Sequence, residues 1–180
     1  PILSITLILS ACSIKEDQTT NQLPNSIEAG PGEELARGKV FHDSNENRIM
    51  DSSEKGIPGV VVSNGVDLVQ TDAQGSYEIP VSDDAIVFVI KPRDWMTPVN
   101  EENLPQFYYI HKPEGSPKSR FPGVEPTGDL PESIDFPLYP QPEPDQFKAI
   151  LFGDPQPRNQ QELDFVTHDV VEELIGSDAA

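Results

Sequence analysis

The sequence predicts a mainly β fold, an antiparallel β-sandwich, followed by a single β-α unit. Three observations predict it. Short segments rich in β-branched and aromatic residues recur at short intervals, glycine and proline punctuate them, and one amphipathic helical pattern lies near the C-terminal end. The 19 prolines and a hydrophobic fraction of only 36% argue against a helical bundle. Strand spacing of this kind is typical of immunoglobulin-like and prealbumin-like sandwiches.

The first part of the chain is an apolar stretch, residues 1–12, that ends in Leu9-Ser10-Ala11-Cys12 and is followed at once by polar residues. This pattern indicates a bacterial lipoprotein signal, in which cleavage before Cys12 exposes it for lipidation. The alternative, a buried strand with a core cysteine, does not explain the abrupt change. No initiator methionine or basic segment precedes the stretch, so we expect a fragment of a longer product.

The expected location follows from this signal. We expect a protein of the cell envelope, anchored to a membrane through lipid, at the outer membrane and either periplasmic or surface-exposed. Residues 13–35 are polar and without periodicity, which predicts a flexible tether.

Residues 43–54, with the sequence DSNENRIMDSSE, have the ligand spacing of an EF-hand-type calcium loop. Arg48 stands where the EF-hand has its turn glycine, so its backbone must reach the bend at a steric cost. Strand-like segments flank the loop, so Ca²⁺ would brace a connection between strands. The alternative is a surface turn rich in Asp and Asn that binds no metal. The predicted ligands are Asp43, Asn45, Asn47, Ile49 through its carbonyl, Asp51 and Glu54.

The sandwich is expected to span residues 36–139, and two glycines mark its turns. Asn64-Gly65 is a hairpin signal, and Gly75 is expected at positive φ. The expected strands are 38–42, 57–63, 68–71, 77–79, 85–90, 106–111 and 133–138. The candidate core is Val40, Phe41, Val60, Val62, Leu68, Tyr77, Ile79, Ile86, Phe88 and Ile90.

The charge of the chain limits its partners. With 31 Asp and Glu against 12 Lys and Arg, the formal net charge is −19, so the surface repels phosphate backbones and no nucleic acid partner is expected. His111 is interpreted as a packing residue and Lys112 as a partner for nearby carboxylates, rather than as ligand-binding groups.

The pattern changes after a proline-rich linker at 140–146. Residues 147–152 predict an apolar strand and residues 159–175 an amphipathic helix, with Asn159 as its cap and Glu162 completing a capping box. Asp154 then follows the first strand of an α/β domain, at the edge where such sheets place their sites. On its own, an aspartate there is more often an ordinary loop residue.

Six sequence blocks together carry a family resemblance. They are GKVFHDSNEN at 38–47, EKGIPGVVVSNGV at 54–66, TDAQGSY at 71–77, FYYIHKPEGSP at 107–117, PTGDLPESIDFPL at 126–138 and FGDPQ at 152–156. In combination they resemble the N-terminal region of bacterial calcineurin-like phosphoesterases that carry an extra N-terminal sandwich domain. The resemblance covers about residues 36–176 and implies that an α/β metallophosphatase domain begins at 147–180.

The resemblance implies a metallophosphoesterase in which two divalent metal ions activate water for attack on a phosphoester substrate. Asp154 matches the first ligand of the family's D-x-H motif, and Gln156 replaces its histidine, which leaves the identity of the metal open. The G-N-H and G-H-x-H motifs do not occur in these 180 residues, so we expect this fragment to be inactive alone. The alternative is a non-enzymatic calcium-stabilised sandwich that serves as a stalk or ligand-binding surface module.

Overall fold

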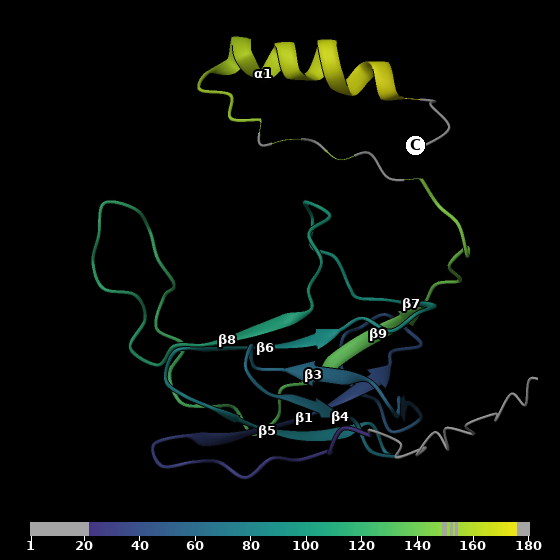
Figure 1. The fold of residues 1–180 in the computed structure, drawn as a ribbon, viewed down its shortest axis with the longest axis vertical. Helices are drawn as coiled ribbons and strands as arrows, with labels where there is room; N and C mark the ends of the chain where they lie inside the picture. The colour runs from purple at the N-terminus through teal and green to yellow at the C-terminus, as the bar shows by residue number, and fades with distance from the viewer. Residues whose placement is uncertain (1–21, 149–150, 152, 154, 176–180) are drawn as a thin grey trace, which may run out of the picture.

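The computed structural model describes residues 22–148, 151, 153 and 155–175 (Figure 1). The predicted signal with Cys12, and residues 13–21 of the predicted tether, lie outside this part. The strands are β1 (Glu34–His42), β2 (Lys55–Gly56), β3 (Val61–Ser63), β4 (Leu68–Gln70), β5 (Ser76–Val81), β6 (Ala85–Ile90), β7 (Trp95–Met96), β8 (Tyr108–His111) and β9 (Phe136–Pro140). The helical elements are α1 (Gln160–Val166), the π-helix η1 (Thr167–Val171) and the 3₁₀ helix η2 (Glu172–Leu174).

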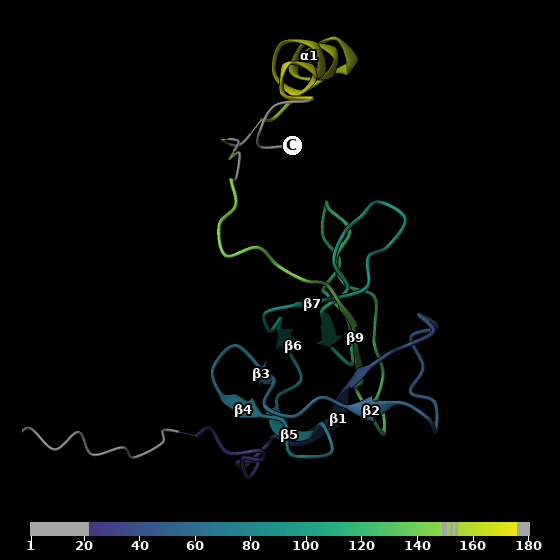
Figure 2. The ribbon, with the colours of Figure 1, turned by 90° about the vertical axis from the view of Figure 1, so that its right-hand side faces the viewer.

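Two sheets form the sandwich. One has the order β2-β1-β9-β7 with β5 paired to β1, and the other has the order β4-β3-β6-β8. In Figure 2, β3, β4 and β6 lie on one side and β1, β2 and β9 on the other. The mainly β sandwich predicted from strand spacing is confirmed. One pair departs from the antiparallel expectation, because β9 runs parallel to β1 with Val40 opposite Phe136.

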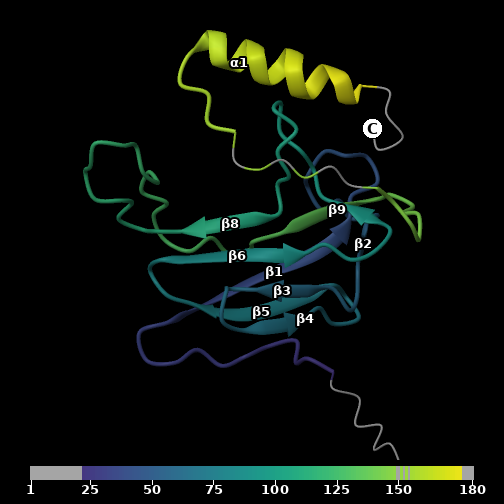
Figure 3. The same cartoon turned by 45° about the horizontal axis from the view of Figure 1, so that its top comes forward.

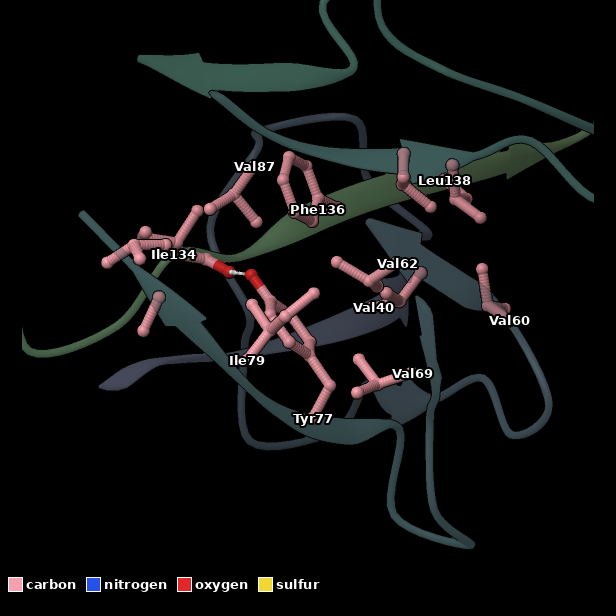
Figure 4. Packing of buried hydrophobic residues seen from close by; sticks show 13 residues of the cluster. Val40, Val60, Val62, Val69, Tyr77, Ile79, Val87, Ile134, Phe136 and Leu138 are labelled. Atoms are coloured by element: carbon pink, nitrogen blue, oxygen red, sulfur yellow. Dashed lines mark hydrogen bonds between the residues drawn. The ribbon is translucent and has the colours of Figure 1, made fainter. Parts of the chain in front are cut away.

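The core between the sheets is centred on Tyr77 and Phe136, whose rings stack with centroids 6.2 Å apart (Figure 4). The hydroxyl of Tyr77 donates to the carbonyl oxygen of Ile134 at 2.7 Å. Burial, and then the negative charge of Asp135, raise the pKa of Tyr77 far above its ordinary value, so the phenol stays neutral. A Cβ at Gly38 would lie 1.8 Å from the same Ile134 oxygen, so this approach of β1 to residue 134 requires glycine.

The predicted core is only partly correct. Val40, Phe41, Val60, Val62, Tyr77 and Ile79 are buried as predicted. Leu68, Ile86 and Ile90 are instead 41%, 48% and 45% exposed, and Phe88 is half-buried. Their sequence neighbours Val69, Val87 and Val89 face inward.

The reason for this error is the sequence of β6. Residues 85–90 are all apolar, so the two faces of the strand cannot be told apart by alternation. Because side chains alternate with a period of two, an error of one residue exchanges the faces completely. Pairing with β3, in which Val62 stands opposite Val89, determines which face is buried.

The strand predicted at 147–152 lies only in part within the described residues. The structure describes Phe147, Lys148 and Leu151, and these three are not in a strand. The remaining residues of this segment lie outside the described part, so the strand stays a prediction.

The helix is confirmed, and Asn159 caps it by accepting from the Glu162 N–H at 3.0 Å. Glu162 in turn accepts from the N–H of Arg158 at 2.7 Å and from the side-chain amide of Asn159 at 3.2 Å. In Figure 1 and Figure 3 the helix lies beyond the strands, and α1 has no buried residue. None of the helices in the described part of the chain is long and apolar enough to cross a membrane.

Candidate calcium loop

The loop at 43–54 is held at both ends by the sheet. Asp43 directly follows β1, and its N–H donates to the carbonyl of Leu138 in β9 at 3.2 Å. Glu54 directly precedes β2, which pairs with β1 through Phe41 opposite Gly56. The first and last predicted ligands are therefore brought close together by strand pairing, independently of any cation.

Asp43 organises the first half of the loop. Its carboxylate is buried, with the residue only 1% exposed, and it accepts from the Asn47 N–H at 3.2 Å and the Arg48 N–H at 2.7 Å. Arg48 has φ +65°, so the unusual backbone conformation predicted at the glycine position is confirmed. This region of φ is disfavoured for residues other than glycine. Glu46, at φ +60°, is a second left-handed residue that the motif did not predict.

The side chains at positions 45, 47 and 51 converge on one oxygen. Oδ2 of Asp51 accepts from the side-chain amides of Asn45 at 2.8 Å and Asn47 at 3.0 Å. The amide oxygens are used locally, since that of Asn45 accepts from the Asn47 N–H and that of Asn47 from the Ile49 N–H. Coordination of a cation through these oxygens requires the amides to turn over, because NH₂ is only a donor.

Glu54 closes the loop. Its Oε1 accepts from the N–H of Ser44 at 2.7 Å and from the Ser44 hydroxyl at 3.1 Å, and its Oε2 accepts from the Asp51 N–H at 3.0 Å. Burial raises the pKa of Glu54, but hydrogen bonds from the Asp51 and Ser44 backbone outweigh it, so the pKa lies below its ordinary value. The carboxylate is therefore ionised at neutral pH. The contribution of Ser44 was missed by the motif, which assigns position 2 no role.

The five side chains do not form one closed shell. The side chains of Asn45 and Asn47 bond to Asp51, whereas the carboxylates of Asp43 and Glu54 accept from backbone N–H groups. Among the residues that the structure describes, no three His, Cys, Asp or Glu side chains are arranged to hold a metal ion. The loop thus has the sequence, the turn conformation and the acidic ends of a calcium loop, with its carboxylates occupied by hydrogen bonds from within the loop.

Arg48 connects the loop to a second segment. Its guanidinium donates to the carbonyl of Val99 at 2.7 Å, and a hollow of 310 Å³ lies beside it, lined in part by Glu46, Met96 and Tyr139. Burial and the negative charge of Asp43 raise the pKa of Tyr139, while a hydrogen bond with Arg48 opposes them. The conformation of the loop is therefore coupled to β9 and to the segment after β7.

The other residues singled out from the sequence lie elsewhere. Asp154 is outside the described residues, and Gln156 lies exposed in a segment without regular structure. His111 is buried as a packing residue, and its Nδ1 has no hydrogen-bond partner in the part of the chain that is described. Lys112 pairs with Asp84 at 2.5 Å, in agreement with its predicted charge-balancing role.

The middle of the chain is similar to a known family. Residues 43–123 match the family model described as the N terminal of calcineurin-like phosphoesterase. The family resemblance carried by the sequence blocks is confirmed over these residues. The match begins at Asp43, so the matched region includes the whole candidate calcium loop.

Two further comparisons add little. No curated protein matches the chain. Among solved structures, the crystal structure of the major plantain pollen allergen Pla l 1 is similar with 12% identity and a TM-score of 0.38, over 63% of this chain and 99% of that chain.

Proposed function

We propose that this chain is the N-terminal part of an exported, lipid-anchored calcineurin-like metallophosphoesterase. The observation that carries the proposal is the match of residues 43–123 to the N-terminal domain of that family. Family members of this kind are hydrolases of phosphoesters, and the chemistry requires divalent metals that activate water and neutralise the developing charge. In this proposal the sandwich is an accessory domain, and the catalytic site begins at Asp154.

The donor set at the catalytic end is compatible with a metal site of this class. Asp154 supplies a carboxylate and Gln156 a neutral amide oxygen, both of which are hard donors suited to divalent cations. An amide binds more weakly than an imidazole, so the first metal would be held less tightly than in a D-x-H site. The role of these two residues is to bind and orient the metal, and the metal supplies the activation of water.

The test is a phosphodiesterase assay of the full-length gene product with bis-p-nitrophenyl phosphate. We expect turnover that EDTA removes and that added Mn²⁺ restores, and we expect the Asp154→Asn variant to lose it. Asp145→Asn is the matched control, because Asp145 is an exposed acid that pairs with Arg93 at 2.6 Å. Absence of metal-dependent turnover in the full-length protein, or retention of activity in Asp154→Asn, would contradict the proposal.

We also propose that the loop at 43–54 binds one Ca²⁺, which serves a structural role. Support comes from three sources: the oxygen spacing, the left-handed conformation of Arg48, and the three carboxylates that the loop contributes, those of Asp43, Asp51 and Glu54. On binding, the cation would replace the hydrogen bonds of Asn45 and Asn47 to Asp51, and the side-chain amides would turn their oxygens inward. Ca²⁺ would then secure the link between β1 and β2.

A further inference from the structure

An apolar surface is left uncovered on the outer face of the β4-β3-β6-β8 sheet. It follows from the register of β6, which turns Val87 and Val89 into the core and directs Ile86 and Phe88 outward. Figure 1 shows β8, β6 and β3 as neighbours in this layer. A groove of 610 Å³ lies on it, between β6, β8, the turn from β3 to β4 and the end of β5. This volume is within the range of small-molecule sites.

The floor of the groove is aromatic and already in place. Phe107 and Tyr108 lie edge to face with ring centroids 5.3 Å apart, and the carbonyl of Phe107 accepts from the Val89 N–H at 3.0 Å. That bond ties the aromatic pair to β6 beside Phe88. The backbone that positions the floor is therefore part of the sheet and needs no rearrangement to receive a ligand.

The rim of the groove is acidic. Glu33, Asp67 and Asp84 line it, and among the described residues no Lys, Arg or His lines it. Asp84 is neutralised by Lys112 at 2.5 Å, but the ion pairs of the described residues do not include Glu33 or Asp67. Asp67 is held in position by Asn64, whose side-chain oxygen accepts from the Asp67 N–H at 2.7 Å and whose amide donates to Asp67 at 3.2 Å. The groove therefore has an apolar floor, with two carboxylates at its edge that no described ion pair neutralises.

Charge limits the possible occupant. A second copy of the chain, with its net charge of −19, would bring one acidic rim against another. The helical segment 160–174 of the same chain has unburied apolar side chains, but it carries five acidic residues and only His168 as a basic one. Both are repelled by the carboxylates at the rim. A ligand of opposite charge with an apolar body satisfies both parts of the groove.

We propose that this groove binds a small amphipathic organic cation, an amine or quaternary ammonium with an aromatic or alkyl body. The cationic group lies at the carboxylates of Glu33 and Asp67, and the body lies on Ile86, Phe88 and Tyr108. A cation beside aromatic faces gains further attraction from the ring quadrupole. This site is separate from the calcium loop and does not depend on the proposed phosphoesterase activity.

The test compares two probes with the same body and opposite charge, phenylpropylamine and phenylpropionate, by amide chemical-shift mapping of the isotopically labelled chain. We expect the amine to give saturable shifts in β6, β8 and residues 64–67, and the acid to give none there. Asp67→Asn should raise the Kd for the amine roughly two- to five-fold, the range for loss of one exposed ion pair. Ile86→Ser should lower the affinity for the amine further, because it removes part of the apolar floor.

Controls separate binding from unfolding. Glu132→Gln removes an exposed acid that does not line the groove, and it should leave the amine affinity unchanged. Ile90→Ser changes an exposed residue of the same strand that lies outside the groove, and it should also have no effect. Ile86→Ser is compared at equal spectral dispersion with wild type, and Asp67→Asn provides a second variant if that condition fails.

Three results would overturn the proposal. Equal binding of the amine and the acid would remove the role of the carboxylates. Shifts confined to other surfaces would place the site elsewhere. A lysine-rich peptide that binds through the same residues more tightly than the amine would make the groove a peptide site instead of a small-molecule site.

Discussion

Calcium binding at residues 43–54 makes a quantitative prediction for thermal stability. The changes are Asp43→Ala and Glu54→Ala, at the first and last positions of the loop, each measured with EDTA and with excess CaCl₂. The assay is differential scanning calorimetry. A ligand at about 100 times its Kd stabilises the folded state by about 2.7 kcal/mol. For a domain of about 100 residues this corresponds to a rise in Tm of about 10 °C.

The structure also predicts how much Asp43→Ala lowers the stability of the fold without calcium. The Arg48 N–H loses its acceptor at 2.7 Å, while the Asn47 N–H keeps the side-chain oxygen of Asn45 at 3.2 Å. One hydrogen bond to a buried charge is therefore lost in full, which costs about 2 to 3 kcal/mol. The Tm in EDTA should fall accordingly, and calcium should restore little of it.

Glu54→Ala separates the two effects, because Glu54 lies closer to solvent and its loss should lower the Tm in EDTA less than the loss of Asp43. The calcium-dependent rise should nevertheless disappear, since a bidentate ligand is removed. Glu132→Ala is the matched control and should keep the full rise. The reasoning is refuted if wild type shows no rise at millimolar calcium, or if both loop variants keep theirs.

Three further predictions concern other parts of the chain. Gly38→Ala should destabilise the fold by at least about 2 kcal/mol in urea unfolding, because its Cβ would lie 1.8 Å from the Ile134 oxygen. Gly153→Ala is the control and should not destabilise the fold, because a Cβ there meets open space. Equal effects of the two substitutions would contradict the packing argument. Folding lowers the pKa of Glu54, so its contribution to the free energy of unfolding should be complete above pH 4.5, its ordinary pKa, and should be lost as the pH falls through the folded pKa. Glu54→Gln should therefore reduce the dependence of the urea midpoint on pH in this range, and an unchanged dependence would contradict the reasoning. Cys12→Ser should abolish incorporation of labelled palmitate in the bacterial host, whereas Ser10→Thr should retain it, and labelling of Cys12→Ser would exclude the lipoprotein assignment.

The sequence predicted local backbone features well. Arg48 at a glycine position of the motif was expected to adopt an unusual conformation, and its φ is +65°. Gly75 was expected at positive φ and has +76°. Both are consequences of short-range sterics, which neighbouring residues determine almost completely.

Features that depend on distant partners could not be predicted. The inward face of β6 is set by its pairing with β3 and β8, and its own uniformly apolar sequence contains no alternation. The parallel pairing of β9 with β1 joins segments about a hundred residues apart, and local patterns do not report orientation.

In the candidate calcium loop, too, local features were predicted and features that depend on other residues were not. Its oxygen spacing was visible in the sequence, whereas the pairing of Asn45 and Asn47 with Asp51 was not, because amide orientation depends on which oxygen lies opposite. The acidic groove was also not predicted, since Ile86 and Phe88, which form part of its floor, had been assigned to the core.

Isothermal titration of the EDTA-treated chain with CaCl₂ tests the account most directly. The account predicts one saturable site per chain, absent in Asp51→Asn and present in Glu132→Gln. No heat of binding from wild type, or the same isotherm from Asp51→Asn, would contradict a calcium-braced link between β1 and β2.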